Sequence, residues 1–342
     1  MPDDERAVNG GDPEGASAPG TPSRALELTG KVPFLWALVV LVVAALGGAA
    51  AFVLLGATRG PRPPFLDGSL PAATLATPSA ASTALTLAGS GSNLPLTRAL
   101  VEAFRKHHPD TKIFVHASIG SGGGVRAVRD GAVDIGLVSR ALTEEEGRLG
   151  LVVTPHVRVA VVVATHPSVP DRCVASAELA AILSGARSTW SDGSRRVVLL
   201  RERGDSSFLA VSRGVPGLAE ENDAAYRAGR WRVLYDDRAM QEALVSTEGA
   251  MGVFDLGAIT SQRLPIKVLC VDGVTASNEE VVAGRYPFWK DLAFVTDGPA
   301  EGLRADLLRF AGSEEGRALA ASLGYIPLPI EGGARARDGG AP

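Results

Sequence analysis

The apolar stretch at residues 157–164 (VRVAVVVA) constrains the fold of this chain most, because such a run is typical of a β-strand buried on both faces. Strand-like and helix-like segments alternate around it. Strands are predicted at 84–87, 112–116 and 133–138, and helices at 94–107 and 125–129, with a glycine-rich loop (SIGSGGG) before the second helix. The alternation predicts an open α/β sheet, in which ligands bind at the loops that leave the carboxyl ends of the strands.

A second apolar run, residues 32–57 (VPFLWALVVLVVAALGGAAAFVLLGA), contains no charged side chain. As a helix it would be about 39 Å long, which exceeds the thickness of the hydrocarbon core of a bilayer. A cleaved secretory signal is the alternative, but such signals have a shorter apolar run and only a short basic segment before it. Here a polar tail, residues 1–31, comes first. We therefore expect one uncleaved transmembrane helix, whose flanking basic residues are too evenly balanced to set its orientation.

The segments on either side of the expected folded domain are polar or rich in small residues. Residues 1–31 and 330–342 are predicted to be disordered tails. Residues 58–84 are predicted to be a semi-extended linker of Pro, Ala, Ser and Thr. This leaves residues 85–329 as the folded domain.

The chain contains two cysteines, Cys173 and Cys270. Outside the cytoplasm they could form a disulfide. Their separation in sequence does not decide between a disulfide and two small buried side chains.

Composition and motifs exclude several classes of function. With 34 basic and 38 acidic side chains, and a formal net charge of −4, the chain lacks the basic excess of a nucleic-acid-binding protein. The GSGSN segment lacks the Lys-Ser/Thr pair of a P-loop, and neither G-x-S-x-G nor HEXXH occurs. The five histidines do not have the spacing of metal ligands. We therefore expect a protein that is not an enzyme and that has no cofactor and no metal site.

Three segments of small residues follow predicted strands and could bind an anion: residues 89–93 (GSGSN), 120–124 (GSGGG) and 204–207 (GDSS). Each can bring backbone N–H groups and hydroxyls close to an anion, with the N-terminus of a helix behind it. Just before the third segment, Arg201 offers a planar guanidinium that suits two oxyanion oxygens, although an ion pair with a neighbouring acid would also account for it. One such turn is weak evidence, whereas three in one domain indicate an anion site.

Taken in order, these segments resemble the phosphate-binding proteins of ABC transporters, the PstS-like branch of the type II periplasmic binding proteins. The resemblance covers about residues 85–329. It depends on eight stretches in the family's order: LAGSGSNLP (87–95), IGSGGGVRAV (119–128), VDIGLVSRAL (133–142), LAAILSGARSTWSDGS (179–194), RERGDSS (201–207), GAMGVFDLGAI (249–259), DGVTASNEEVVAGRYPFWKDLAFVT (272–296) and GSEEGRALAASLGYIPLP (312–329).

The resemblance implies an α/β, two-lobed clamshell preceded by the transmembrane helix. About residues 85–158 and 287–329 would form one lobe, about 165–285 the other, and two strands would join them. A phosphate ion in the cleft would be held by the residues that match the family's contacts, which are Asn93, Leu94, Ser121, Ser139, Arg201, Asp205, Ser206 and Ser207.

The function implied is phosphate capture for uptake through an ABC transporter permease. The binding domain would lie on the extracytoplasmic, or periplasmic, side of the cell (inner) membrane. The alternatives are a receptor for another oxyanion, such as tungstate, molybdate or sulfate, and a sensory or scaffolding ectodomain. A phosphatase is the alternative from the enzyme class.

Two positions depart from the best-known members of the family. Ser139 stands where some members carry an aspartate that accepts the proton of hydrogen phosphate. The third anion-binding segment is usually Gly-Ser-Gly-Thr, but here it reads Gly-Asp-Ser-Ser at 204–207. Asp205 either points away from the anion, which its charge would repel, or accepts the P–OH hydrogen in place of the missing aspartate. Our hypothesis is the second. This would favour phosphate over sulfate, because fully ionised sulfate has no proton to donate.

Overall fold

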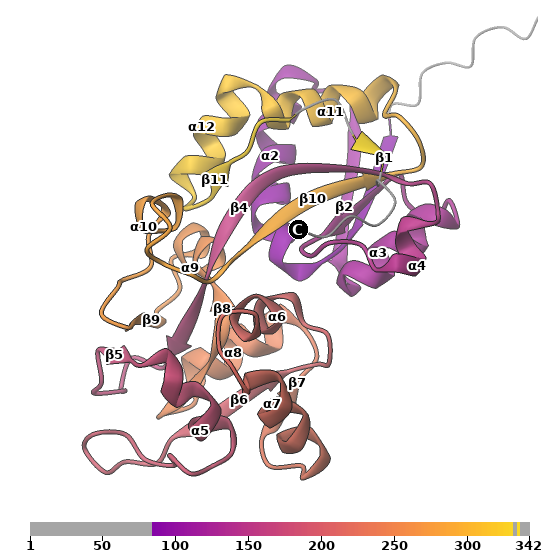
Figure 1. The fold of residues 1–342 in the computed structure, drawn as a ribbon. Helices are drawn as coiled ribbons and strands as arrows, with labels where there is room; N and C mark the ends of the chain where they lie inside the picture. The colour runs from indigo at the N-terminus through magenta and orange to yellow at the C-terminus, as the bar shows by residue number, and fades with distance from the viewer. Residues whose placement is uncertain (1–83, 331–333, 336–342) are drawn as a thin grey trace, which may run out of the picture. The chain divides into compact units, whose positions relative to one another are not determined.

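The computed structural model describes residues 84–330 and 334–335, which form two α/β lobes around one connected sheet (Figure 1). The main path of the sheet runs β2-β1-β3-β10-β4-β8-β6-β7. The strands are β1 (Ala84–Gly89), β2 (Lys112–Ser118), β3 (Ile135–Val138), β4 (Val152–Thr165), β5 (Cys173–Val174), β6 (Val197–Arg201), β7 (Arg232–Leu234), β8 (Ala250–Asp255), β9 (Lys267–Val271), β10 (Trp289–Thr296), β11 (Ile326–Pro327) and β12 (Ala334–Arg335).

Lobe 1 is built on the parallel strands β2, β1 and β3, which continue into the antiparallel β10 and the first half of β4. One apolar cluster packs α2, α11 and α12 on one face of this sheet, and a separate cluster packs α3 on the other. The helices of lobe 1 are η1 (Gly91–Asn93), α2 (Leu94–His107), α3 (Gly120–Arg129), α4 (Glu144–Gly147), α11 (Gly302–Gly312) and α12 (Glu314–Ser322).

Lobe 2 is built on β8, β6 and β7, together with the second half of β4 and the strands β9 and β5. Its apolar core is a single cluster. Cys173 in β5 lies opposite Cys270 in β9, with their Cα atoms 4.3 Å apart, and the two form a disulfide. The remaining helices are η2 (Ser176–Glu178), α5 (Leu179–Leu183), α6 (Ser206–Ser212), α7 (Leu218–Arg227), α8 (Asp237–Ser246), α9 (Leu256–Gln262) and α10 (Asn278–Val282).

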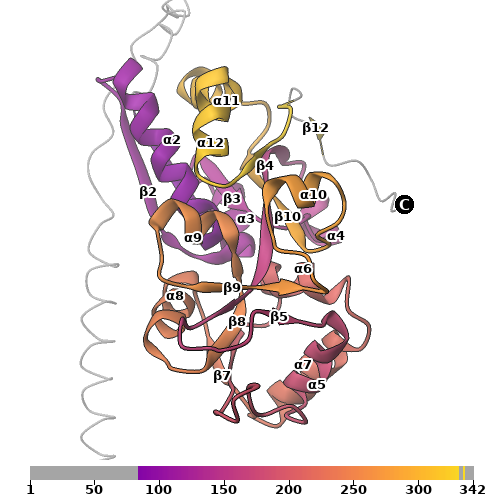
Figure 2. The ribbon, with the colours of Figure 1, turned by 90° about the vertical axis from the view of Figure 1, so that its left-hand side faces the viewer.

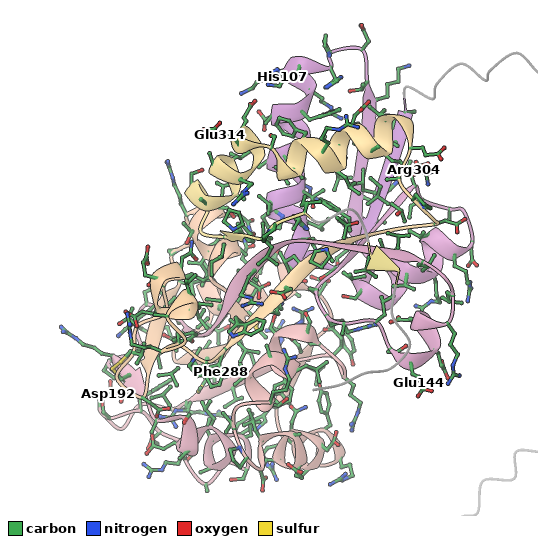
Figure 3. The ribbon with its side chains drawn as sticks, turned by 45° about the horizontal axis from the view of Figure 1, so that its top comes forward. His107, Glu144, Asp192, Phe288, Arg304 and Glu314 are labelled. Carbon is green, nitrogen blue, oxygen red and sulfur yellow. A yellow bond between two sulfur atoms is a disulfide. The ribbon has the colours of Figure 1, made fainter. Side chains whose placement is uncertain are left out.

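The two lobes are joined by β4 and by the segment that leads into β10 (Figure 2). β4 pairs with β10 as far as Ala160, and from Val161 onward it pairs with β8. The chain returns at Phe288, labelled in Figure 3, whose carbonyl oxygen accepts a hydrogen bond of 2.9 Å from the N–H of Val161. The two lobes of the fold are therefore connected through adjacent backbone segments.

The first long helix has the bounds that its periodicity predicts, residues 94–107. Leu96, Leu100 and Phe104 recur at helical spacing, and all three are buried in the lobe 1 core. Pro95 lies in the first turn, where its missing N–H removes no helical hydrogen bond. Local sequence is therefore sufficient to place this helix.

The prediction of a glycine-rich loop before residue 125 is wrong, because α3 already begins at Gly120. Packing explains the difference. A Cβ atom on Gly124 would lie 2.9 Å from the Cα atom of Gly89 and 3.0 Å from the carbonyl oxygen of Ala88. The glycines thus let the first turns of the helix lie directly on β1, and the N-terminus of α3 comes close to the carboxyl ends of β1 and β3.

The predicted transmembrane helix at 32–57 lies outside the described residues, as does the polar tail before it. The linker and the C-terminal tail lie almost entirely outside them. Among the residues that the structure describes, no helix has both the length and the apolar character needed to cross a bilayer.

Candidate functional site

A cavity of about 730 Å³ lies between the two lobes. Its walls come from the carboxyl ends of strands and the first turns of helices on both sides. The lobe 1 wall includes Ser90, Gly91, Ser92, Ser118, Ile119, Gly120, Ser121, Gly122, Gly123, Ser139 and Arg140. The lobe 2 wall includes Arg201, Glu202, Arg203, Gly204, Asp205, Ser206, Leu209, Tyr235 and Asp237.

The lobe 1 wall is a cluster of hydroxyl groups around Ser139, which directly follows β3 and is almost fully buried. The Ser139 Oγ atom lies 2.7 Å from Ser90 Oγ and 3.3 Å from Ser121 Oγ. The backbone N–H of Ser139 donates to Ser121 Oγ at 3.2 Å. The strand order brings these groups together, because β1 and β3 are parallel neighbours and their carboxyl ends meet at one edge.

The lobe 2 wall is centred on Arg201, the last residue of β6, which is 5% exposed. Its guanidinium donates two hydrogen bonds to the Glu202 carboxylate, at 2.9 and 3.0 Å. It also lies 3.2 Å from Asp237 Oδ1 and 3.5 Å from Asp205 Oδ2. Burial disfavours the charged form, but these carboxylates outweigh it, and the pKa of Arg201 is raised above its usual value. The arginine thus makes the ion pairs that the sequence left open and also faces the cavity.

Two aspartates of the lobe 2 wall face the cavity from the N-termini of helices. Asp205 caps α6, because its Oδ1 accepts a hydrogen bond of 2.9 Å from the N–H of Phe208. Asp237 begins α8 and lies so close to Gly91 of lobe 1 that a side chain on Gly91 would collide with its carboxylate. Burial raises the pKa of Asp237 above its usual value, and Arg201 offsets only part of that rise.

The two walls meet through hydrogen bonds between side chains. Ser139 Oγ in lobe 1 lies 2.8 Å from Ser206 Oγ in lobe 2. Behind them, the Lys290 ammonium on β10 donates to hydroxyl groups from both lobes, at 2.8 Å to Ser92 and 2.7 Å to Ser207. Lys290 Nζ also lies 2.9 Å from Asp255 Oδ1, and both side chains are almost fully buried. The floor of the cavity is therefore a polar network that includes an ion pair.

The structure brings five of the predicted site residues to one cavity: Ser121, Ser139, Arg201, Asp205 and Ser206. The other three do not line it. Asn93 is fully buried and donates to the carbonyl oxygen of Val138 at 2.8 Å. Leu94 lines a different pocket, between α2 and α8. Ser207 faces Lys290 and Asp255.

Sequence reasoning missed several groups of the site. Ser90 and Ser92 lie within the GSGSN segment, which was predicted to bind an anion. These two serines were not named as site residues. For Asp255 one signal was present, because it is the only charged side chain in the apolar strand β8. Asp237 and Lys290 lie in α8 and β10, which carry other charged side chains, so no local signal distinguished them. Among the residues described, no group of three or more His, Cys, Asp or Glu side chains is arranged to hold a metal ion.

A family model described as the PBP superfamily domain matches residues 75–315 of the chain. The chain belongs to the PBP superfamily. The matched residues include both lobes and the walls of the cavity between them.

Individual members of the PBP superfamily resemble this chain over most of its length. The phosphate-binding protein PstS of Bacillus subtilis (strain 168) is 29% identical over 263 residues, which cover 72% of this chain and 82% of the relative. A solved substrate-binding protein from Clostridium perfringens, with bound phosphate, has a TM-score of 0.64 at 24% identity and covers 72% of this chain and 99% of its own. A phosphate-binding protein from Stenotrophomonas maltophilia has a TM-score of 0.56 at 15% identity, over 72% and 90% of the two chains. At these identities the solved structures support the fold.

Proposed function

We propose that this chain binds phosphate in the cavity between its lobes and presents it to the permease of an ABC transporter. One observation carries the proposal: neutral hydroxyl donors from lobe 1 and a buried arginine from lobe 2 line the same cavity. Ser121 and Ser139 are on one side, and Arg201 with Ser206 on the other. A tetrahedral anion between them would contact both lobes at once. The name of the Bacillus subtilis relative, a phosphate-binding protein, supports this ligand.

The mechanism is binding without chemical reaction. The Ser139–Ser206 hydrogen bond of 2.8 Å closes the floor of the cavity. An anion that enters there would separate the two hydroxyls and accept a hydrogen bond from each. A ligand favours the closed form only through contacts that this form makes and the open form lacks. Donors on both lobes meet that requirement, and the closed shape would be the signal that the permease recognises.

The acidic side chains of the cavity favour phosphate over sulfate. Asp205 and Asp237 both line it beside Arg201. An ionised carboxylate repels a fully ionised anion. It can instead accept a hydrogen bond from the P–OH group of hydrogen phosphate, which sulfate lacks at neutral pH. Asp205 keeps its Oδ2 atom for this role, since Oδ1 caps α6.

The anchor and the location belong to the same proposal. Residues 32–57 would hold the chain in the membrane, and residues 58–84 would let the binding domain reach a neighbouring permease. The Cys173–Cys270 disulfide supports an oxidising, extracytoplasmic location. Deleting residues 32–57 should release the protein from the membrane fraction, and a deleted chain that stays there would contradict the anchor.

Thermal unfolding of the full chain with different anions tests the proposed ligand. A ligand present at 100 times its Kd adds about 2.7 kcal/mol to the free energy of unfolding. We expect phosphate to raise the melting temperature, and sulfate and molybdate to do so much less. A larger rise with sulfate or molybdate would identify a receptor for another oxyanion. If none of the three anions changes the melting temperature, the proposal is contradicted. Hydrolysis of a phosphoester by the same protein would then favour an enzyme, and its absence would favour a scaffold.

A further inference from the structure

Lys290 lies at the junction of the lobes, and it was not among the residues that the sequence pointed to. It is on β10, directly after the segment that returns the chain from lobe 2 to lobe 1, and its side chain is 2% exposed. A lysine buried to this degree requires a counter-charge and hydrogen-bond acceptors. Asp255 at the end of β8 supplies the charge, at 2.9 Å from Nζ. Because the charges of Lys290 and Asp255 cancel, the pair acts on the cavity mainly by orienting the hydroxyl groups around it.

The ammonium group of Lys290 determines which way the neighbouring hydroxyl hydrogens point. Nζ lies 2.8 Å from Ser92 Oγ, 2.7 Å from Ser207 Oγ and 3.1 Å from Ser206 Oγ. An ammonium group can only donate, so none of these hydroxyls can point its own hydrogen at Nζ. The three N–H groups serve four acceptors, Asp255 Oδ1 and the three serine oxygens, so one of the hydrogens is shared. Each serine therefore keeps its own O–H to donate in another direction. Ser207 directs its hydrogen to Asp255 Oδ1 at 3.3 Å.

The other two serines belong to the walls of the cavity. Ser92 and Ser206 both line it, Ser92 from lobe 1 and Ser206 from lobe 2. The Ser206 hydroxyl reaches Ser139 Oγ at 2.8 Å. For the Ser92 hydroxyl, the described part of the chain offers no hydrogen bond other than the one from Lys290. Because the ammonium of Lys290 cannot accept a hydrogen bond, Ser92 in lobe 1 and Ser206 in lobe 2 each keep an O–H group that can donate to a ligand in the cavity.

We propose that Lys290 is a positioning residue that presents the hydroxyl hydrogens of Ser92 and Ser206 to the bound anion from opposite lobes. This inference rests on the proposed function, since it concerns the donors of the same oxyanion site. It adds Ser92 to the groups that contact the anion. It also gives the Lys290–Asp255 pair a role in binding that neither residue performs by direct contact.

The test removes the donor and keeps the charge balance. Lys290→Met combined with Asp255→Asn replaces the ion pair by a neutral pair of similar size, so that no unpaired charge is left buried. We expect the full chain to bind phosphate about 30-fold more weakly, because two donors lose their fixed orientation. If this variant does not fold by circular dichroism, Lys290→Gln with Asp255→Asn keeps a polar group in the same space. Affinity equal to that of the unmodified protein would overturn the inference.

Arg158 and Asp291 provide a matched control. They form an ion pair between β4 and β10, the strand that also carries Lys290, with Arg158 Nε 2.7 Å from Asp291 Oδ1. Neither side chain lines the cavity. Arg158→Met with Asp291→Asn should leave phosphate affinity unchanged within about 2-fold. A loss as large as that of the Lys290 variant would show that any ion pair on β10 matters, and would overturn the role assigned to Lys290.

A double-mutant cycle separates positioning from a general structural role. Ser92→Ala alone should weaken phosphate binding about 10-fold, because one oriented donor is lost. In the Lys290→Met/Asp255→Asn background the same substitution should cost less than about 2-fold, since the hydroxyl is no longer oriented. If Ser92→Ala costs the same in both backgrounds, Lys290 does not act through this hydroxyl and the inference fails.

The anion panel distinguishes failure of this inference from failure of the proposed function. Isothermal titration of the unmodified chain with phosphate, sulfate and molybdate comes first. If sulfate or molybdate binds and phosphate does not, the proposed ligand is wrong, and the same cycle with the anion that binds decides the role of Lys290. If none of the three binds, there is no oxyanion for the hydroxyls to contact, and both proposals fall.

Discussion

The two walls of the cavity offer an anion different chemical groups. The centre of the lobe 1 wall is a set of neutral hydroxyls around Ser139, joined by hydrogen bonds of 2.7 to 3.3 Å. The lobe 2 wall surrounds one buried arginine, Arg201, with the carboxylates of Glu202, Asp205 and Asp237. Neutral donors can be lost singly at modest cost, whereas a charge cluster fails as a unit once its central, buried cation is removed. We therefore expect the two lobes to contribute unequally to the affinity for phosphate and to the pH dependence of stability.

The largest expected effect is that of Arg201→Met. It removes the buried cation at the centre of the lobe 2 wall and leaves the three carboxylates around it without their shared partner, so we expect phosphate affinity to fall about 1000-fold. Ser139→Ala on the opposite wall should cost only about 10-fold, the value of one neutral hydrogen bond and its orientation. Isothermal titration of both variants measures the difference. Similar losses at the two positions would abolish the distinction between the walls.

The next effect concerns the acid stability of lobe 1, where His156 stacks on Phe294 with ring centroids 4.1 Å apart. Burial lowers the pKa of His156 to about 3, against an ordinary value of 6.5. The unfolded chain therefore binds a proton that the folded chain excludes, and stability falls as the pH drops below 6.5. At pH 5 this should cost about 2 kcal/mol relative to pH 7.5.

His156→Phe, which keeps a stacked ring, should remove this part of the pH dependence in urea unfolding curves. In lobe 2, Asp237 changes the free energy of unfolding in the opposite direction as the pH falls. Burial raises the pKa of Asp237 in the folded state above its ordinary value. Between these two pKa values the folded chain binds a proton that the unfolded chain does not, so this group stabilises the fold as the pH falls through that range. An unchanged pH profile in the His156→Phe variant would show that this histidine is not the acid-sensitive group.

The smallest expected effect is that of Asp205→Asn. Asparagine also caps helices well, so α6 should keep its N-cap while the cavity loses a proton acceptor. We expect phosphate to bind about 10-fold more weakly, and discrimination against sulfate to relax. Competition between the two anions measures this. If both affinities stay the same, Asp237 is the carboxylate to examine in the same way.

Local patterns in the sequence were enough for those parts of the molecule that depend on near neighbours. The apolar periodicity at 94–107 gave the bounds of α2, and the apolar run at 157–164 lies within the buried strand β4. Small residues after strands, with Arg201 just before the third segment, indicated an anion site, and five of the residues carried over from the resemblance line one cavity. Helical spacing and strand burial are properties of short segments, which is why they can be read without a structure.

Long-range packing decided the rest. The start of α3 at Gly120 depends on how closely Gly124 approaches β1, and the disulfide depends on the pairing of β5 with β9. Lys290 and Ser92, which are 198 positions apart, meet only because β10 returns to the junction of the lobes. A buried charge acquires its role from the acceptors that surround it, and those come from distant segments. Residue type and local spacing identified the kind of site, whereas the directions of its donors were set by the folded chain.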